Sequence, residues 1–187
     1  PLDNVSIEEK IAFTLSMEEE LLAKEKIKNV PYNGVSDSIA QRSVFTTSGL
    51  YAKSKQRYCS ASAHALMEYE RKTVMEGSGK VSRKFGELDY LEIVEETYSR
   101  CAGLLDGEAI PTRHYDVILD QEYQPELFST FASMFSAQSA KDGVNPMRDK
   151  VGELIADTQL NVSDSPQLID GFGYTLFDSE GTKTVAT

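Results

Sequence analysis

Apolar and charged residues alternate with a helical period near the start of the chain. The apolar positions on the shared face are Ile7, Ile11, Leu15 and Leu22. Just before them, Ser6 and Glu9 have the spacing of a capping box, in which each side chain bonds a free backbone N–H at a helix start. The pattern predicts an amphipathic helix from Ser6 to about Lys26. We expect four helix-disfavouring residues to end it: Asn29, Pro31, Asn33 and Gly34.

The segment from Asp37 to Phe85 is rich in Ser, Thr, Val, Tyr and Ala, a composition typical of strands. It predicts an antiparallel meander of three strands, which we place at 38–47, 50–67 and 72–84, with a bulge at 77–79. Alternation along the second strand places one set of residues on one face (Tyr58, Ser60, Ser62, His64) and another on the opposite face (Cys59, Ala61, Ala63, Ala65). Because both sets are mostly small, we expect close packing on each side.

Helical spacing returns from about Asp89 to Leu105, and Gly107 is placed to cap that helix. Helix, meander and helix predict a compact α+β unit over residues 1–110. The later pattern predicts a strand at 114–120, a helix from Pro125 to Gly143, a shorter helix at 147–156, a strand at 159–162 and an irregular tail from 171. The expected fold class is therefore α+β: an antiparallel β meander flanked by helices, followed by the start of a second α/β-rich domain at 111–187.

Charge excludes some classes of partner. The 187 residues include 30 Asp and Glu against 19 Lys and Arg, for a formal net charge of −11. We expect no nucleic acid partner, because phosphate-backbone binding needs clustered Lys and Arg. The densest basic stretch, from Lys72 to Lys84 and including Arg83, is interpreted as a solvated hairpin edge. No apolar run approaches the roughly 20 residues of a membrane-spanning helix, and no export signal is readable, so we expect a cytoplasmic protein with no membrane partner.

Few side chains have the spacing of a catalytic or metal site. Cys59 and Cys101 are far apart in sequence and form no CxxC motif, so we expect two reduced, buried thiols. His64 and His114 each lack a second ligand at helical or hairpin spacing, so no metal motif is readable. A Cys/His nucleophile pair assembled by the fold is an alternative, although cysteines embedded in strands and helices are more often packing groups.

Two carboxylates lie in a distinctive pattern, Phe-Asp-Ser-Glu-Gly, which holds Asp178 and Glu180. The structural interpretation is an acidic turn in which Asp178 bonds to nearby backbone. Shortly before it, Gly171-Phe172-Gly173 lacks the third glycine of a phosphate loop, so we interpret it as a flexible turn. A hydrolase that uses Asp178 or Glu180 with a cysteine is a further alternative, but no activated nucleophile is visible.

Several of these segments, taken together in chain order, form a larger pattern. They are Gly34 to Phe45, the Ser-rich strands, Ile110 to Asp120, Lys150 to Glu153, Val162 to Pro166, Gly171 to Tyr174 and Phe177 to Thr182. In this order they resemble the TldD/PmbA family, formerly labelled a modulator of DNA gyrase. The closing stretch that begins at Asp178 matches the family's D-[DS]-E-G-x-x-T pattern. The resemblance covers most of the chain and is closer in the second half.

The resemblance implies that residues 1–110 form the family's middle α+β region and residues 111–187 the first, truncated part of its C-terminal domain. TldD-type members carry an HExxxH zinc motif on the helix that follows the strand at 114–120. The corresponding stretch here, 124–135, contains no histidine. The resemblance therefore implies a PmbA/TldE-type subunit without its own zinc site, and zinc is expected in a partner subunit.

The resemblance also implies partners and site residues. The partner would be a TldD-like zinc subunit or a second copy, and the substrate a peptide or unfolded polypeptide in proteolysis or peptide maturation. The family-motif residues with a possible peptide or interface role are Gly171, Gly173, Asp178, Glu180 and Gly181. No residue is assigned as catalytic or as a metal ligand. The alternative is a non-catalytic scaffold or dimerisation module with no peptidase role.

Overall fold

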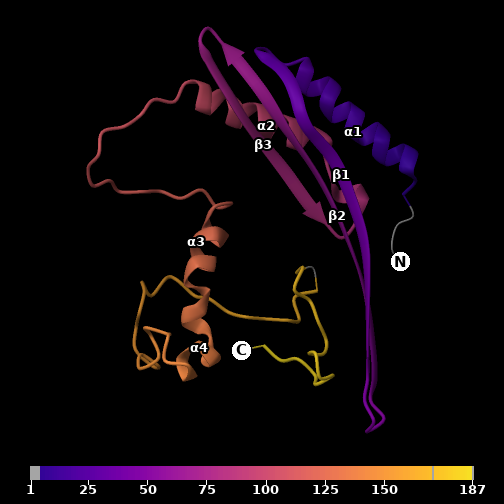
Figure 1. Cartoon of the computed structure of the whole chain (residues 1–187), viewed down its shortest axis with the longest axis vertical. Helices are drawn as coiled ribbons and strands as arrows, with labels where there is room; N and C mark the ends of the chain where they lie inside the picture. The colour runs from indigo at the N-terminus through magenta and orange to yellow at the C-terminus, as the bar shows by residue number, and fades with distance from the viewer. Residues whose placement is uncertain (1–4, 170, 187) are drawn as a thin grey trace. The chain divides into compact units, whose positions relative to one another are not determined.

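The computed structural model describes residues 5–169 and 171–186, and the chain divides into two compact units. Unit 1 combines residues 1–109 with residues 165–187, and unit 2 is Ile110–Asp164. Figure 1 labels the helices and strands of both units.

The first helix, α1, spans Ile7–Leu22 and begins with the predicted capping box. The backbone N–H of Ser6 donates to a carboxylate oxygen of Glu9 at 2.7 Å, and the N–H of Glu9 donates to the Ser6 hydroxyl at 3.1 Å. The helix stops at Leu22, a turn earlier than expected. Lys26 then adopts a left-handed φ of 67°, which reverses the chain into the sheet.

Three antiparallel strands follow, in the order β1-β2-β3, so the predicted meander is confirmed. They are β1 (Ile27–Phe45), β2 (Tyr51–Tyr69) and β3 (Lys72–Ser82). The expectation that Pro31 and its neighbours end the first helix is wrong, because the helix ends before them and they lie inside β1, which begins at Ile27 rather than at 38. Proline is tolerated there because β1 is an edge strand, and the register shifts on both sides of Asn29.

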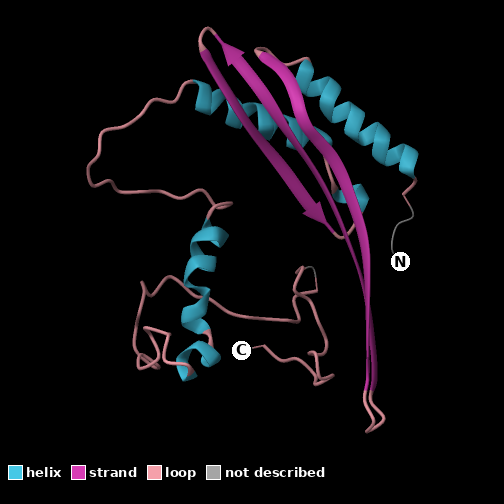
Figure 2. Ribbon diagram, viewed as in Figure 1, coloured by secondary structure: helices cyan, strands magenta, loops and turns pink. Residues whose placement is uncertain are grey.

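β1 and β2 extend well beyond β3. β3 pairs with β2 only from Cys59 to Tyr69, whereas β1 pairs with β2 from one end to the other. Residues 38–45 and 51–58 therefore form a two-stranded ribbon, which closes at the turn around Gly49. Figure 2 shows this ribbon continuing past the end of β3.

The core of unit 1 lies between one face of the sheet and two helices, α1 and α2 (Tyr90–Leu105). On β2 the alternate residues predicted to share a face are all at most 1% exposed: Cys59, Ala61, Ala63 and Ala65. Their small side chains let α2 approach closely, and the Thr97 hydroxyl donates to the Ala63 carbonyl at 3.3 Å. Ile93 and Val94 of α2 are fully buried here, each contributing about 1.5–3 kcal/mol.

The opposite face of β2 is more open. Ser62 is exposed and Tyr58, Ser60 and His64 are half-buried, so the expectation of close packing on both faces is wrong at Ser62. The predicted bulge at 77–79 is also wrong, because the pairing of β2 with β3 runs without a shift. Gly77 has another role: a Cβ there would come within 2.6 Å of the His64 ring, so glycine lets the imidazole lie across β3.

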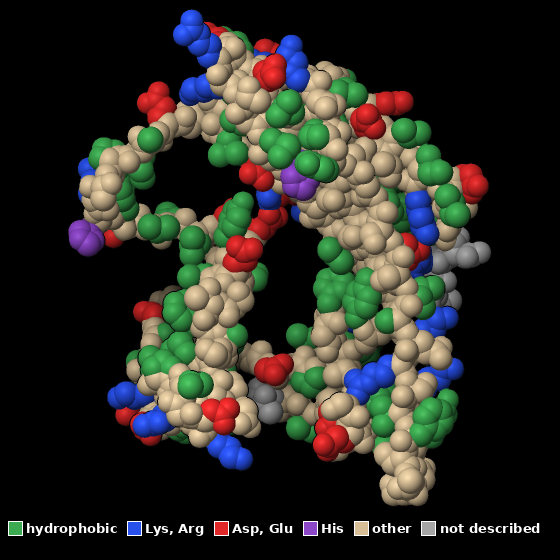
Figure 3. Space-filling model, viewed as in Figure 1, with side chains coloured by type: hydrophobic (Ala, Val, Ile, Leu, Met, Phe, Trp, Pro, Cys, Tyr) green, Lys and Arg blue, Asp and Glu red, His purple; other side chains and the backbone are tan. Residues whose placement is uncertain are grey.

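Unit 2 contains α3 (Gln124–Phe131), a 3-10 helix at Ala132–Phe135 and α4 (Ala137–Lys141), so the helix expected from Pro125 to Gly143 is broken into short pieces. The strands expected at 114–120 and 159–162 and the helix at 147–156 are turns or irregular chain. Val117 and Ile118 are 72% and 98% exposed, and no described residue pairs with them as a strand. Hydrophobic side chains gather on the surface around α3 and α4 (Figure 3).

No helix in the described part of the chain is both long and apolar enough to cross a membrane. Together the elements confirm the expected α+β class, with a three-stranded antiparallel sheet and flanking helices.

Candidate functional site

The open face of the sheet in unit 1 holds the tail segment that carries the family motifs. Four polar side chains point from this face toward residues 171–178, and we call them the donor row: Arg42, Gln56, Tyr58 and Arg83. Gln56 and Tyr58 share a face of β2 because they are two residues apart. The antiparallel register brings Arg42 of β1 to the same face, opposite Ser54. Arg83 directly follows β3.

The donor row contacts main-chain carbonyl groups rather than side chains of the tail. Arg42 donates to the carbonyl of Asp178, and Arg83 donates to that of Gly171. The Gln56 amide donates to the carbonyl of Tyr174, and the Tyr58 hydroxyl lies 3.1 Å from that of Phe172. Because every residue has a main-chain carbonyl, such contacts hold an extended chain with little dependence on its sequence.

Aromatic rings reinforce these polar contacts. The Arg42 guanidinium lies 5.0 Å from the ring centre of Phe177, which is only 7% exposed. The Arg83 guanidinium lies between two rings, at 5.7 Å from Tyr58 and 6.0 Å from Tyr174. Guanidinium groups are attracted to the faces of aromatic rings. The ring contacts therefore hold both arginines in place in addition to their hydrogen bonds to the tail.

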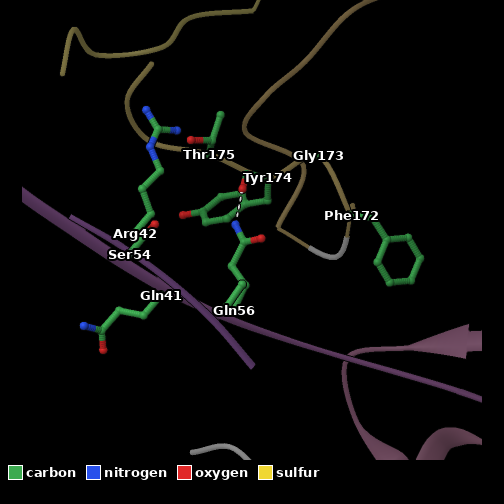
Figure 4. A pocket seen from close by; sticks show the side chains of 9 residues that line it. Gln41, Arg42, Ser54, Gln56, Phe172, Gly173, Tyr174 and Thr175 are labelled. Carbon is green, nitrogen blue, oxygen red and sulfur yellow. Dashed lines mark hydrogen bonds between the residues drawn. The ribbon is translucent and has the colours of Figure 1, made fainter. Parts of the chain in front are cut away.

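A cavity of about 280 Å³ lies between the ribbon and the tail. Figure 4 shows Arg42, Ser54 and Gln56 on the ribbon side, with Gly173 and Thr175 on the tail side. The lining is amide, hydroxyl and guanidinium rather than carboxylate or imidazole. Its chemistry therefore suits hydrogen bonding to a polar ligand better than acid–base catalysis.

The two predicted carboxylates have different surroundings. Asp178 organises a tight turn: one of its carboxylate oxygens accepts the backbone N–H groups of Glu180 and Thr182, each at 2.9 Å. The N–H of Asp178 donates to the carbonyl of Thr182, also at 2.9 Å. Glu180 is exposed at the turn. The acidic turn proposed as a structural role for Asp178 is therefore what the chain forms.

The three predicted glycines all lie on this tail. Gly171 supplies the carbonyl that Arg83 binds, and Gly173 lines the cavity. Gly181 closes the turn with a left-handed φ of 86°, and a Cβ there would collide with Leu50 at the tip of the hairpin. The structure thus brings the motif residues to one surface of unit 1 and places them against the β1–β2 ribbon.

Sequence reasoning missed the donor row. The sequence pattern predicts a solvated hairpin edge at Arg83, but the residue is half-buried and its guanidinium lies over the rings of Tyr58 and Tyr174. Strand alternation placed Tyr58 on the correct face, but nothing in the local pattern indicated which part of the chain would cover it. The contacts join residues more than eighty positions apart, such as Arg83 and Gly171, so neither segment alone predicts them.

The described residues do not fit a metal ion. No three His, Cys, Asp or Glu side chains in the described ranges come together as a ligand set. His64 contacts the Tyr32 ring edge-on at 6.1 Å between ring centres. Cys59 and Cys101 are both buried, and neither forms a disulfide.

Comparison with family models defines the class of protein. A model described as the PmbA/TldA metallopeptidase central domain matches residues 1–105, and one described as the PmbA/TldA metallopeptidase C-terminal domain matches residues 112–187. The class is thus that of metallopeptidase-related α+β proteins. The chain belongs to the TldD/PmbA family.

Solved structures have the same fold. A candidate modulator of a DNA gyrase from Thermotoga maritima aligns with a TM-score of 0.90 at 22% identity, and one from Bacteroides thetaiotaomicron with 0.88 at 20%. Each alignment covers 98% of this chain but 42% of the other. The chain therefore spans less than half the length of these structures. No curated protein matches it significantly.

Proposed function

We propose that this chain is the non-zinc, PmbA/TldE-type subunit of a two-subunit metallopeptidase that acts in proteolysis or peptide maturation. The observation that carries the proposal is the pair of matches to the central and C-terminal metallopeptidase domains. The assignment to the non-zinc type is supported by the stretch 124–135. It contains no histidine where TldD-type members carry HExxxH.

The role we assign to the chain within the complex is to hold the peptide and to provide an interface. The donor row supports this role, because its four side chains meet main-chain carbonyls of the tail segment 171–178. Recognition through the main chain suits an enzyme whose substrates vary in sequence. We place the partner, a zinc-bearing TldD-type subunit or a second copy, with this chain in the cytoplasm.

The test uses the purified full-length protein, alone and mixed with a zinc-bearing TldD-type subunit from the same source. Zinc content is measured by elemental analysis, and hydrolysis is followed on a quenched-fluorescence peptide library. The matched control is a partner subunit in which glutamine replaces the glutamate of HExxxH. This change keeps the two histidines but removes the neighbouring carboxylate.

We expect the protein alone to contain no zinc and to hydrolyse no peptide. The mixture with the zinc-bearing partner should hydrolyse peptides, and the mixture with the control partner should not. Zinc and hydrolysis in the protein alone would overturn the non-zinc assignment. Hydrolysis by the partner that does not change on mixing would overturn the supporting role.

A scaffold or dimerisation module is the second candidate, and one observation favours it. One face of α1 exposes an aliphatic stripe, with Ile7, Ile11 and Leu15 at 70%, 53% and 51% exposure. Together with Val35 of β1 it lines an apolar groove, a surface typical of interfaces. A scaffold should associate through this stripe without changing any hydrolysis rate, so the mixing experiment separates the two functions.

A further inference from the structure

Arg83 has an unusual environment on the open face of the sheet. Its guanidinium lies between the rings of Tyr58 and Tyr174, and one terminal nitrogen donates to the carbonyl of Gly171. Its Nε–H is buried, and no described residue accepts a hydrogen bond from it. A charged donor is therefore enclosed by the tail segment but only partly satisfied by it.

The chemistry of arginine indicates what would satisfy this group better. Guanidinium presents its N–H donors in a rigid fork that matches the two oxygens of a carboxylate. A single neutral carbonyl uses one arm of the fork, and leaving a buried donor unpaired is unfavourable. The Gly171 carbonyl is thus a poor match for Arg83. A carboxylate would accept hydrogen bonds from both N–H donors of the fork and would balance the positive charge.

A cavity of about 490 Å³ adjoins Arg83 and is open to such a group. Val81 and Phe172 supply apolar wall, and Lys84 lines the cavity as the ion-pair partner of Glu87. The one carboxylate of its lining, Glu87, already accepts from the Ser82 hydroxyl at 2.5 Å and from Lys84 at 2.8 Å. The cavity is therefore lined by the Arg83 guanidinium, whose Nε–H has no acceptor among the described residues, and by the Glu87 carboxylate, which its neighbours neutralise.

The covering segment is suited to being displaced. Phe172 is 46% exposed, and no atom lies within 4 Å of where a Cβ of Gly173 would be. The backbone N–H of Tyr174 donates to the carbonyl of Gly171 at 3.1 Å and closes the turn. The other contacts that hold its carbonyls to the sheet are the side-chain hydrogen bonds from Gln56, Tyr58 and Arg83. None of residues 171–174 belongs to the buried core of unit 1, so displacing them would exchange surface hydrogen bonds and leave that core intact.

We propose that Arg83 is a carboxylate-binding residue of the peptide site, and that residues 171–174 cover it until a peptide carboxylate replaces the Gly171 carbonyl. The carboxylate belongs either to an acidic side chain or to the C-terminus of the peptide. The inference rests on the proposed peptide-holding function and adds a preference for acidic or C-terminal segments.

The test measures binding of fluorescein-labelled heptapeptides to the full-length protein by fluorescence anisotropy. Four otherwise identical Ala/Ser peptides are used: an amidated neutral one, one with a free C-terminus, an amidated one with a central Glu, and an amidated one with a central Gln. The variants are R83Q, which removes the cation, and R83K, which keeps the charge but loses the fork. R71Q is the matched control, because Arg71 is an exposed arginine at the β2–β3 turn.

We expect at least one carboxylate peptide to bind more tightly than its neutral counterpart by about 10- to 100-fold, the range of charge-assisted hydrogen bonds. R83Q should abolish that difference, R83K should keep part of it, and R71Q should leave it unchanged. Which of the two carboxylate peptides binds identifies the source. Hydrogen exchange at residues 171–175 should speed up on binding, since the segment is displaced.

Two other results separate failure of this inference from failure of the proposed function. If all four peptides bind equally well, the protein holds peptides but Arg83 does not select carboxylates, and only the inference is overturned. If none binds, both the inference and the peptide-holding role are wrong. A circular dichroism melt of each variant guards against misfolding, and R83K provides the comparison if R83Q fails to fold.

Discussion

Arg57 and Asp37 form a bidentate ion pair beneath α1. The Nε of Arg57 donates to one carboxylate oxygen at 2.8 Å, and its Nη2 donates to the other at 2.6 Å. Lys10 of α1 reaches the same carboxylate at 2.7 Å. The Arg57 side chain is 2% exposed. The pair therefore joins β1 to β2, and Lys10 links α1 to both strands.

Replacing Asp37 by Asn should destabilise the protein by about 3 kcal/mol at pH 7, because it leaves the buried Arg57 without its counter-charge. Urea unfolding followed by circular dichroism measures the change. E95Q is the matched control, because Glu95 forms an ion pair with Lys24 at an exposed position. A loss for D37N no larger than that for E95Q would show that Arg57 is not held by this pair.

Stability should also fall with acid through Asp37 and a second carboxylate, Glu96. Hydrogen bonds from Arg57 and then Lys10 lower the pKa of Asp37 to about 2. A hydrogen bond from Ser78, assisted by Arg100 and Lys80, lowers the pKa of Glu96 to about 2. Because both pKa values are lowered on folding, the stabilisation is complete above the unfolded-state values and is lost as pH falls toward 2.

The urea midpoint should therefore fall steadily between pH 4.5 and pH 2, the range bounded by the unfolded pKa of Glu and the folded values. The double variant D37N/E96Q should be less stable at pH 7 but show a shallower fall across that range. The midpoints are measured at constant ionic strength. An equally steep fall in the double variant would assign the acid sensitivity to other groups.

Local patterns were enough to predict most of unit 1. The capping box at Ser6 and Glu9, the alternation along β2 and the helical stripe after Asp89 each depend on residues close in sequence. The start of β1 was missed because Pro31 usually ends regular structure. Its position at a sheet edge, where a missing N–H costs nothing, is decided by the fold.

Unit 2 and the donor row could not be predicted in the same way. The apolar residues at Val117 and Ile118 have strand character, but a strand also needs a hydrogen-bonded neighbour, and none lies among the described residues. The donor row depends on contacts between Arg42 and Asp178 and between Arg83 and Gly171, which are distant in the chain. The motif glycines can be recognised from a local pattern. The residues that contact them cannot, because those residues are distant in the chain.

A leucine substitution should change the stability of the protein much more on one face of β2 than on the other. Ala63 is fully buried beneath α2, so A63L must push the helix away and should cost about 1–3 kcal/mol. Ser62 is its neighbour in sequence but is exposed on the open face, so S62L should change stability by less than about 0.5 kcal/mol. Thermal and urea unfolding of the pair test this. Equal losses would mean that the open face is packed as closely as the helix face.

Replacing Gly181 by Ala should release the tail turn from the hairpin. Gly181 has a φ of 86°, so alanine is strained there, and its Cβ would force the Leu50 side chain to move. Because the turn and the ribbon are also joined through Arg42 and Asp178, the donor-row contact should weaken with it. Amide hydrogen exchange reports this directly. The N–H of Thr182 donates to the Asp178 carboxylate within the turn, the N–H of Thr184 donates to the Leu176 carbonyl beside it, and both should exchange at least about tenfold faster. G173A is the matched control, since a Cβ at Gly173 meets no atom within 4 Å and φ is not left-handed there. Unchanged exchange in G181A, or an equal increase in G173A, would show that the Leu50 contact does not hold the turn in place.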